Sequence, residues 1–145
     1  MKKKIVALLL LALLLAQPLA LAVNHVAVPT MAYQVIQQVN MERSRRGLQA
    51  LGIDYNLRAA AYIRAQEMLQ KFSHTRPNGS KWNTVSKLAY GENIARGQRS
   101  VDKVMAAWMS SQGHRQNILR PGYGSIGVSC IKSGNIYYWV QLFGR

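Results

Sequence analysis

The sequence has few of the side chains from which active sites are usually built. Its 145 residues include five acidic residues, three histidines and one cysteine. With a single thiol the chain can form no internal disulfide, so its fold must rest on packing alone. The cysteine, Cys130, lies in a run of alternating apolar residues, and we interpret it as a small core residue rather than a nucleophile. No internal repeat, low-complexity tract or glycine-rich phosphate loop is present in the sequence.

The N-terminus has the pattern of a secretory signal peptide. Lysines at positions 2–4 precede an unbroken apolar run over residues 5–16, and Ala20-Leu21-Ala22 is a small-x-small cleavage site. The apolar run is shorter than the roughly 20 residues that a membrane-spanning helix needs. We therefore predict a signal peptide over residues 1–22, with an uncleaved N-terminal anchor as the alternative. The expected location is extracellular, or periplasmic if the organism has an outer membrane.

The chain is strongly basic, with 19 Lys and Arg against 5 Asp and Glu and a net charge of +14. Loss of the signal peptide would lower this charge to about +11. Such a balance favours an anionic neighbour: a charged cell-wall polymer, an anionic lipid or a host component. Solubility and surface retention are the plainer explanation. Nucleic acid is not expected, because the signal peptide argues against an intracellular role and no recognition motif is apparent. A monomer is expected.

The start of the mature chain predicts a lead-in followed by a helix. Residues 23–30 show no periodicity, and we interpret His25 as solvated. A helix is expected over residues 30–46, with Thr30 as its N-cap and Gly47 as its C-terminal stop. Three arginines near its end suit the helix dipole: Arg43, Arg45 and Arg46.

The clearest helix is expected over residues 55–72, capped by Asp54. One apolar stripe runs along it: Leu57, Ala61, Ala65, Met68 and Phe72. A third helix is expected after its N-cap Ser100, and a short one over residues 114–119.

The C-terminal part predicts an antiparallel hairpin. Residues 125–132 alternate between apolar and polar, and residues 136–143 return as a strand that is apolar on both faces. A strand buried on both faces needs cover on both sides, so helices are expected to flank the sheet. The predicted fold class is α/β (α+β), with one domain over residues 31–145.

Two histidines and one glutamate are the best candidates for polar chemistry. His74 lies 18 residues before Glu92, and His114 lies 22 residues after it. Two neutral imidazoles and a carboxylate can bind Zn²⁺ with an open fourth position, as in hydrolytic zinc sites. The alternative is that each group bonds a nearby backbone amide. A Ser-His-Glu hydrolase using Ser110 or Ser111 is also conceivable, although neither serine lies in a nucleophile elbow.

Four ordered blocks of the sequence resemble a known family. They are FSHTRPNG at 72–79, GENIA at 91–95, WMSSQGHRQNIL at 108–119 and YWVQLFG at 138–144. With these blocks the chain is similar to the bacterial branch of the CAP superfamily. That superfamily groups cysteine-rich secretory proteins, antigen 5 and plant pathogenesis-related proteins. The similarity extends over about residues 31–145.

The resemblance implies a three-layer α-β-α sandwich with the C-terminal hairpin in its central sheet. It also implies a shallow cavity lined by His and Glu side chains, which holds a divalent metal in some members. By position, His74 and Glu92 match the first cavity histidine and glutamate, and His114 stands in the Gly-His-Arg block of bacterial members. Residues 108–111 lack the second cavity glutamate of many eukaryotic members. The resemblance thus leaves open a weaker Zn²⁺ site or none.

Three amides are candidates for orienting the histidines and the glutamate through hydrogen bonds: Asn93, Asn117 and Gln141. Plain bonds to backbone are the competing interpretation. Two functions follow from the sequence. The first is an exported binding module that engages a lipid, a wall polymer, a host molecule or a small apolar ligand through the cavity and the basic surface. The second is a metal-dependent hydrolase, with His74 and His114 as ligands and Glu92 as third ligand or general base.

Overall fold

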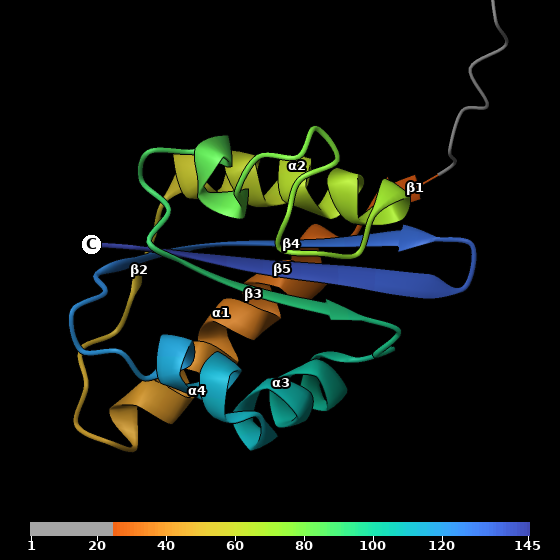
Figure 1. Cartoon of the computed structure of the whole chain (residues 1–145). Helices are drawn as coiled ribbons and strands as arrows, with labels where there is room; N and C mark the ends of the chain where they lie inside the picture. The colour runs from red at the N-terminus through yellow and green to blue at the C-terminus, as the bar shows by residue number, and fades with distance from the viewer. Residues whose placement is uncertain (1–24) are drawn as a thin grey trace, which may run out of the picture.

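The computed structural model describes residues 25–145, and the signal peptide predicted over residues 1–22 lies outside them. Within the described part, the chain forms four α-helices and five strands that share one sheet. Helix α2 covers one face of the sheet, while α1, α3 and α4 cover the other (Figure 1). The predicted three-layer α-β-α sandwich is therefore confirmed.

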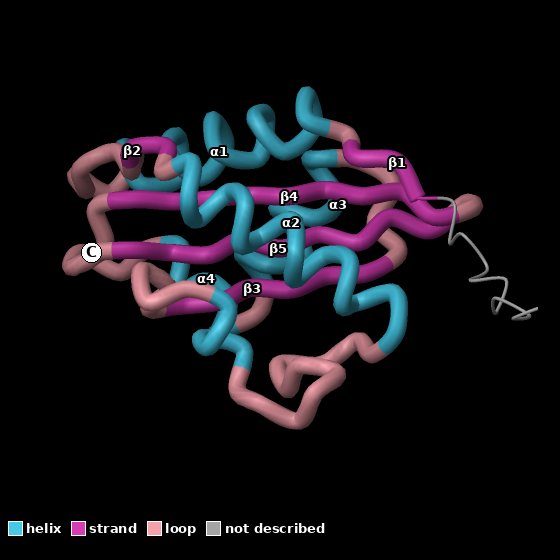
Figure 2. Tube along the Cα trace, turned by 90° about the horizontal axis from the view of Figure 1, so that it is seen from above, coloured by secondary structure: helices cyan, strands magenta, loops and turns pink. Residues whose placement is uncertain are grey.

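The sheet is built around a long C-terminal hairpin. Strands β4 (Ser125–Ser133) and β5 (Ile136–Gly144) pair antiparallel along their full length, as predicted. Strand β3 (Gly91–Arg96) pairs antiparallel with β5, and β1 (His25–Ala27) pairs antiparallel with β4. The short β2 (Gly52–Ile53) runs parallel to β4, so the central strands β4 and β5 lie between short outer ones (Figure 2).

Two of the three predicted N-caps are confirmed. Asp54 accepts bonds from the backbone amides of Asn56 and Leu57 and so begins α2 (Tyr55–Gln70). Ser100 accepts from the amide of Lys103 and begins α3 (Val101–Ser110). The third, Thr30, is wrong.

Helix α1 (Pro29–Ser44) begins one residue before Thr30, with Val28 at the cap position. Proline suits the first helical position, because its fixed backbone angle is helical and its missing N–H is not needed there. Other boundaries also shift, and α1 ends at Ser44 rather than at residue 46. Helix α2 ends at Gln70 rather than at residue 72, and α4 (Gln112–Ile118) begins two residues early. A 3-10 turn, η1 (Trp82–Val85), lies in the loop after α2.

The outer strands were not predicted from the sequence, and the surroundings of two side chains differ from those predicted. His25 is not simply solvated: it lies in β1, and its Nε2 is 3.2 Å from Nε2 of Gln66. Arg43 does not serve the dipole of α1 from the surface. The residue is 1% exposed. The guanidinium donates to the backbone oxygens of Gln49, Ile118 and Arg120 at 2.8–3.0 Å. Its Nη2 also donates to the backbone oxygen of Tyr123 at 3.4 Å.

The core has one cluster on each face of the sheet. The larger lies under α1, α3 and α4, and the smaller lies under α2. Cys130 is a free cysteine that is 2% exposed within the larger cluster, which confirms its role as a core residue. No helix in residues 25–145 is long and apolar enough to cross a membrane.

Candidate functional site

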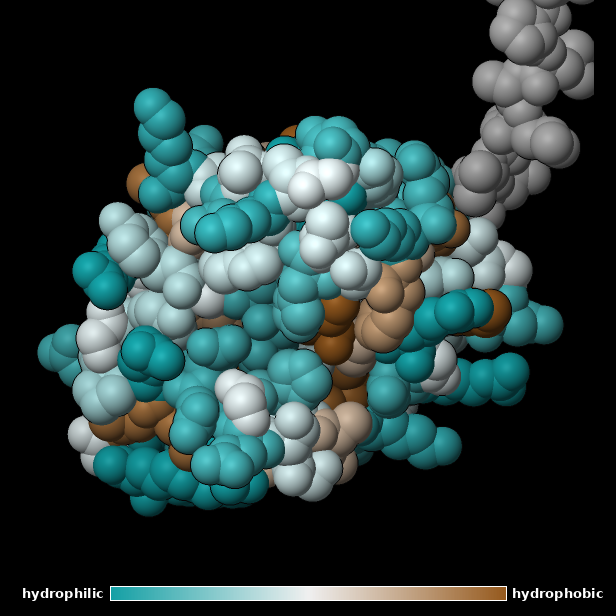
Figure 3. Space-filling view, viewed as in Figure 1, coloured by the Kyte–Doolittle hydropathy of each residue, from teal (hydrophilic) through white to brown (hydrophobic). Residues whose placement is uncertain are grey.

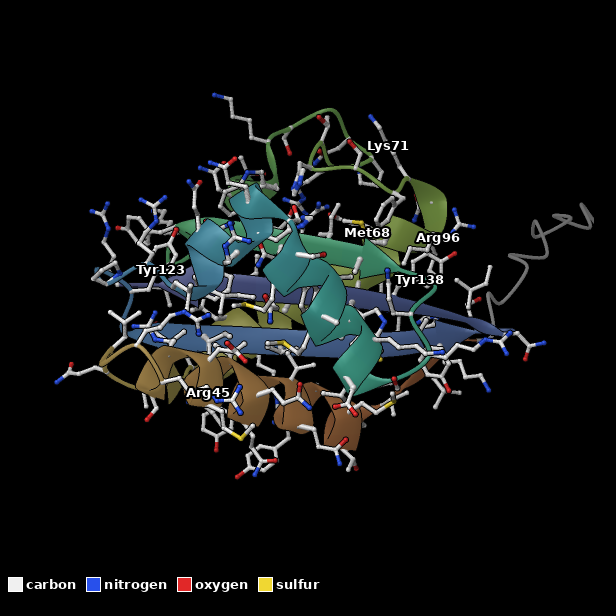
Figure 4. All side chains as sticks on the ribbon, turned by 90° about the horizontal axis from the view of Figure 1, so that it is seen from below. Arg45, Met68, Lys71, Arg96, Tyr123 and Tyr138 are labelled. Atoms are coloured by element: carbon white, nitrogen blue, oxygen red, sulfur yellow. The ribbon has the colours of Figure 1, made fainter. Side chains whose placement is uncertain are left out.

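The predicted site lies at the start of β3. The loop after α2 carries His74, β3 carries Glu92, and α4 carries His114 and Asn117. These segments surround a pocket of about 440 Å³. In Figure 4, Tyr123 of the pocket wall lies at one end of the molecule, opposite Arg96 and Tyr138 at the other end of β3.

The carboxylate of Glu92 has two charged or polar partners. Its side chain is completely buried, and Oε2 accepts a bond of 2.7 Å from Nε of Arg64. Oε1 accepts bonds of 3.1 Å from Nη2 of Arg64 and 2.8 Å from Nδ1 of His74. The structure therefore brings together His74 and Glu92, as predicted, but it adds an arginine that the sequence analysis did not include.

Arg64 is held in place by contacts on every side of its guanidinium. It lies on α2 with no exposed side-chain area, and it also bonds Glu67 and the backbone oxygen of Ser73. Burial lowers the pKa of Arg64, but its bonds to Glu92 and Glu67 outweigh this and raise it overall. The guanidinium thus remains a permanent positive charge inside the site.

His74 connects the buried pair to the solvent. Its side chain is 52% exposed. An ionised carboxylate can only accept a hydrogen bond, so Nδ1 of His74 carries the hydrogen in its contact with Glu92. This tautomer leaves Nε2 as the nitrogen available on the other edge of the ring.

His114 is near this pair but does not complete a three-ligand set. Burial lowers the pKa of the His114 imidazole, and a positive charge on His74 would lower it further. Within residues 25–145, no group of three His, Cys, Asp or Glu side chains is arranged to hold a metal ion. The structure thus brings two of the three predicted ligands into contact.

The three supporting amides form their own network. Asn93 donates from Nδ2 to the backbone oxygen of His114 and to Oε1 of Gln141, both at 3.0 Å. Asn117 donates to Oδ1 of Asn93 at 2.9 Å and to the backbone oxygen of Glu92 at 3.3 Å. These bonds join α4 to β3 and β5. Asn93 and Asn117 bond backbone oxygens, which matches the structural interpretation, whereas Gln141 bonds the amide of Asn93 and the sulfur of Met105.

The residues present do not fit a divalent metal. Both oxygens of Glu92 already accept from a guanidinium, and a unit charge about 4 Å from another contributes about 4 kcal/mol at an effective dielectric of 20. A cation placed at Glu92 would meet that repulsion from Arg64, whose charge is fixed. Zn²⁺ binding stays an untested prediction that this geometry disfavours.

The rim of the pocket contains cations and aromatic rings that the sequence analysis missed. The guanidinium carbon of Arg120 lies 5.4 Å from the ring centre of Tyr123, and that of Arg145 lies 4.5 Å from the ring centre of Tyr90. The hydroxyl of Tyr123 donates to the backbone oxygen of Tyr90 at 3.0 Å. Gly91 is required at this point, because a Cβ there would lie 2.4 Å from the Tyr123 hydroxyl.

One sequence signal could have revealed Arg64. It falls on the apolar stripe of α2, three residues after Ala61 and four before Met68, both buried. A charged residue in an apolar stripe must find buried hydrogen-bond acceptors or a partner of opposite charge. No comparable signal marks Arg120 or Arg145, because exposed arginines near loops are common.

Comparisons with known proteins agree with this fold. Residues 36–143 match the family model "CAP: Cysteine-rich secretory protein family". The protein YkwD of Bacillus subtilis, described as uncharacterized, is 41% identical over 118 residues, which are 76% of this chain and 45% of YkwD. The chain therefore spans less than half the length of this relative.

Solved structures give the same result. An extracellular protein containing a SCP domain from Bacillus anthracis has a TM-score of 0.71 and 26% identity, covering 81% of this chain and 41% of that one. An outer surface protein of Borrelia burgdorferi has a TM-score of 0.72 and 19% identity, covering 84% and 97%. With most of its length matched by the family model, this chain belongs to the cysteine-rich secretory protein (CAP) family.

Proposed function

We propose that this CAP-domain protein is exported and binds an anionic polymer of the cell envelope through its basic surface. The observation that carries the proposal is the asymmetry between its charges. Every acidic residue has an internal partner, whereas most of the basic residues within residues 25–145 have none of opposite charge. The partners of the acidic residues are Arg45 and Arg46 for Glu42, backbone amides for Asp54, Arg64 and Arg76 for Glu67, Arg64 and His74 for Glu92, and Gln38 for Asp102.

The unpaired cations are spread over the surface. Those that are exposed and form no ion pair within residues 25–145 include Arg58, Lys71, Lys81, Lys87, Arg96, Arg99, Lys103, Arg120 and Arg145. The face shown in Figure 3 is mostly hydrophilic, with a narrower hydrophobic strip. A positive field of this kind attracts a polyanion and binds it at many weak contacts.

Export supports an envelope polymer as the anionic partner. The N-terminal segment predicts a signal peptide, and similar structures come from proteins described as extracellular or as outer surface proteins. A polymer with repeated phosphates or carboxylates matches a surface whose own carboxylates are all engaged. An anionic lipid surface would also attract this charge, whereas a neutral lipid or an uncharged host molecule would not.

The experiment measures binding of the purified protein to a poly(glycerol phosphate) wall polymer and to neutral dextran. We expect binding to the polyanion alone, with at least a tenfold loss of affinity between 50 and 300 mM salt, because the contacts between surface charges are screened. A variant carrying Lys71→Gln, Lys81→Gln and Lys87→Gln should bind more weakly. Absence of binding at low salt, or affinity independent of salt, would refute the proposal.

The hydrolase alternative has one observation in its favour. The bond of 2.8 Å between His74 and Glu92 is the geometry that orients an imidazole as a general base. The remaining parts are not assembled, since the Ser110 hydroxyl donates to the backbone oxygen of Ala107 within its own helix. Release of product from a wall polymer, lost in His74→Ala, would favour this alternative.

A further inference from the structure

The pocket at the start of β3 contains a carboxylate that is already neutralised. The side chains of Glu92 and Arg64 are both completely buried, with 2.7 Å between Oε2 and Nε. His74 occupies the next position on the same carboxylate. The guanidinium of Arg64 bonds both oxygens of Glu92 and occupies the place from which a divalent cation would approach. The carboxylate therefore has its hydrogen-bond partners already, and the pair carries no net negative charge.

Two further cations face the pocket without such a partner. Arg120 and Arg145 line it and are exposed, and neither forms an ion pair within residues 25–145. Each guanidinium lies over a tyrosine ring at a cation–π distance, Arg120 over Tyr123 and Arg145 over Tyr90. This contact restrains the guanidinium while its N–H groups stay available, which suits the binding of a carboxylate or phosphate.

The walls suit a hydroxylated ring. Trp82 and Tyr90 contribute aromatic surface to the pocket, and His74 contributes a polar ring edge. The Tyr123 ring is buried against Phe143 and lies beneath Arg120. The apolar faces of a sugar ring pack on aromatic side chains, whereas its hydroxyl groups need polar partners. The volume of about 440 Å³ lies in the range of small-molecule sites, which is about 300–1,000 Å³.

We propose that this pocket binds the oxyanion of an acidic or phosphorylated sugar, without a metal ion. Arg120 and Arg145 bind the oxyanion, the aromatic side chains contact the ring, and Arg64 keeps the carboxylate of Glu92 from attracting cations. The inference rests on the proposed function for the source of the ligand, a unit of an envelope polymer. It goes beyond that function by assigning a defined pocket in place of distributed surface charge.

The first experiment titrates the purified protein with glucuronate, glucose 1-phosphate and glucose in buffer that contains EDTA. We expect at least one of the two anions to bind tenfold or more tightly than glucose. The tighter of the two identifies the oxyanion as a carboxylate or as a phosphate. Equal binding of glucose, or no binding of either anion at millimolar concentration, would overturn the inference.

Matched variants separate the pocket from the surface. The double variant Arg120→Gln, Arg145→Gln should lose tenfold or more in affinity for the tighter anion. Arg58→Gln is the control, because Arg58 is also exposed and lies over a tyrosine ring, at 5.3 Å from the Tyr55 ring centre, but is outside this pocket. An equal loss in Arg58→Gln would assign binding to surface charge, so that the pocket inference fails and the polymer proposal stands.

If an anion binds in the pocket but the protein has no affinity for the polymer, the pocket inference stands and the polymer proposal fails. A melting temperature within a few degrees of the wild type verifies that the double variant is folded. If it is not, Arg120→Lys with Arg145→Lys keeps both charges but removes the planar groups, and it should still weaken binding severalfold.

A zinc titration tests the absence of a metal ion. Without EDTA, we expect no stoichiometric heat of Zn²⁺ binding and no change in affinity for the anion. Stoichiometric zinc binding that disappears in His74→Ala would show a cation site in this pocket and overturn the inference.

Discussion

Arg64 of α2 and Glu92 of β3 form an ion pair in which neither side chain has any exposed area. The pair joins the helix on one face of the sheet to an outer strand. It also fixes the pocket side of β3, because Glu92 has its backbone oxygen bonded by Asn117 and its carboxylate bonded by His74. The stability of the protein and the geometry of the site therefore both depend on this ion pair.

Arg64→Met should lower the free energy of unfolding by about 3–5 kcal/mol, since it leaves a buried carboxylate without its counter-ion. Denaturation in urea measures this. The double variant Arg64→Met, Glu92→Gln should recover about 1 kcal/mol or more of that loss, because the unpaired charge is gone. A double variant that is less stable than the single one would contradict the explanation.

Arg43→Lys should destabilise the protein by about 2 kcal/mol or more. Lysine keeps the charge, but its single ammonium group cannot donate to all of the carbonyl oxygens that the buried guanidinium of Arg43 bonds. Each buried carbonyl left without a hydrogen bond costs about 1–3 kcal/mol. The control is Arg45→Lys at a side chain that is 65% exposed, where we expect a change within about 0.5 kcal/mol. Equal effects at both positions would show that Arg43 acts only through its charge.

Gly127→Ala should be strongly destabilising, by about 2 kcal/mol or more, because overpacking forces the backbone to move. A Cβ at this position would lie 2.2 Å from the backbone carbon of Leu57, where β4 passes the start of α2. Gly113→Ala is the control, since a Cβ there meets nothing within 4 Å. In α4 it should be neutral or stabilise by up to about 1 kcal/mol, and thermal melts compare the two.

Burial raises the pKa of the Cys130 thiol to about 12. The thiol should therefore resist Ellman's reagent at pH 8 in the native protein and react with one equivalent in guanidinium. The pKa of this thiol is higher in the folded protein than its value of about 8.5 in the unfolded chain. Its contribution to stability is therefore fully present below about pH 8.5, and it is lost as the pH rises toward 12.

Cys130→Ala tests the sign of this dependence. Its free energy of unfolding should fall less steeply between pH 9 and 11 than that of the wild type, measured by urea denaturation at each pH. Parallel slopes for the two proteins would mean that the thiol does not contribute.

The sequence predicted the parts of the fold that depend on local patterns. Asp54 and Ser100 were identified as caps because a cap needs only its own side chain and the next few amides. The hairpin of β4 and β5 was identified by alternation and a turn. Strands β1 and β2 were missed because segments of three and two residues are too short for a period to be visible.

The site was predicted only in part, because its contacts join distant segments. The grouping of His74 with Glu92 was predicted from the scarcity of acidic residues and histidines and from the family resemblance, and no local pattern of the sequence encodes their contact. Arg64 is 28 residues from Glu92, and only its position in an apolar stripe indicates a buried partner. The positions of the two arginines at the rim depend on where the C-terminal ends of α4 and β5 come together, which is a property of the whole fold.

The buried guanidinium of Arg43 has a consequence for ligand binding in the pocket. It bonds the carbonyl groups of Ile118, Arg120 and Tyr123, so the segment that presents a cation and a ring to the pocket is attached to a helix in the core. A ligand would meet this wall already in its bound shape. Little conformational entropy would be lost on association, and even a small ligand with few contacts could then be held selectively.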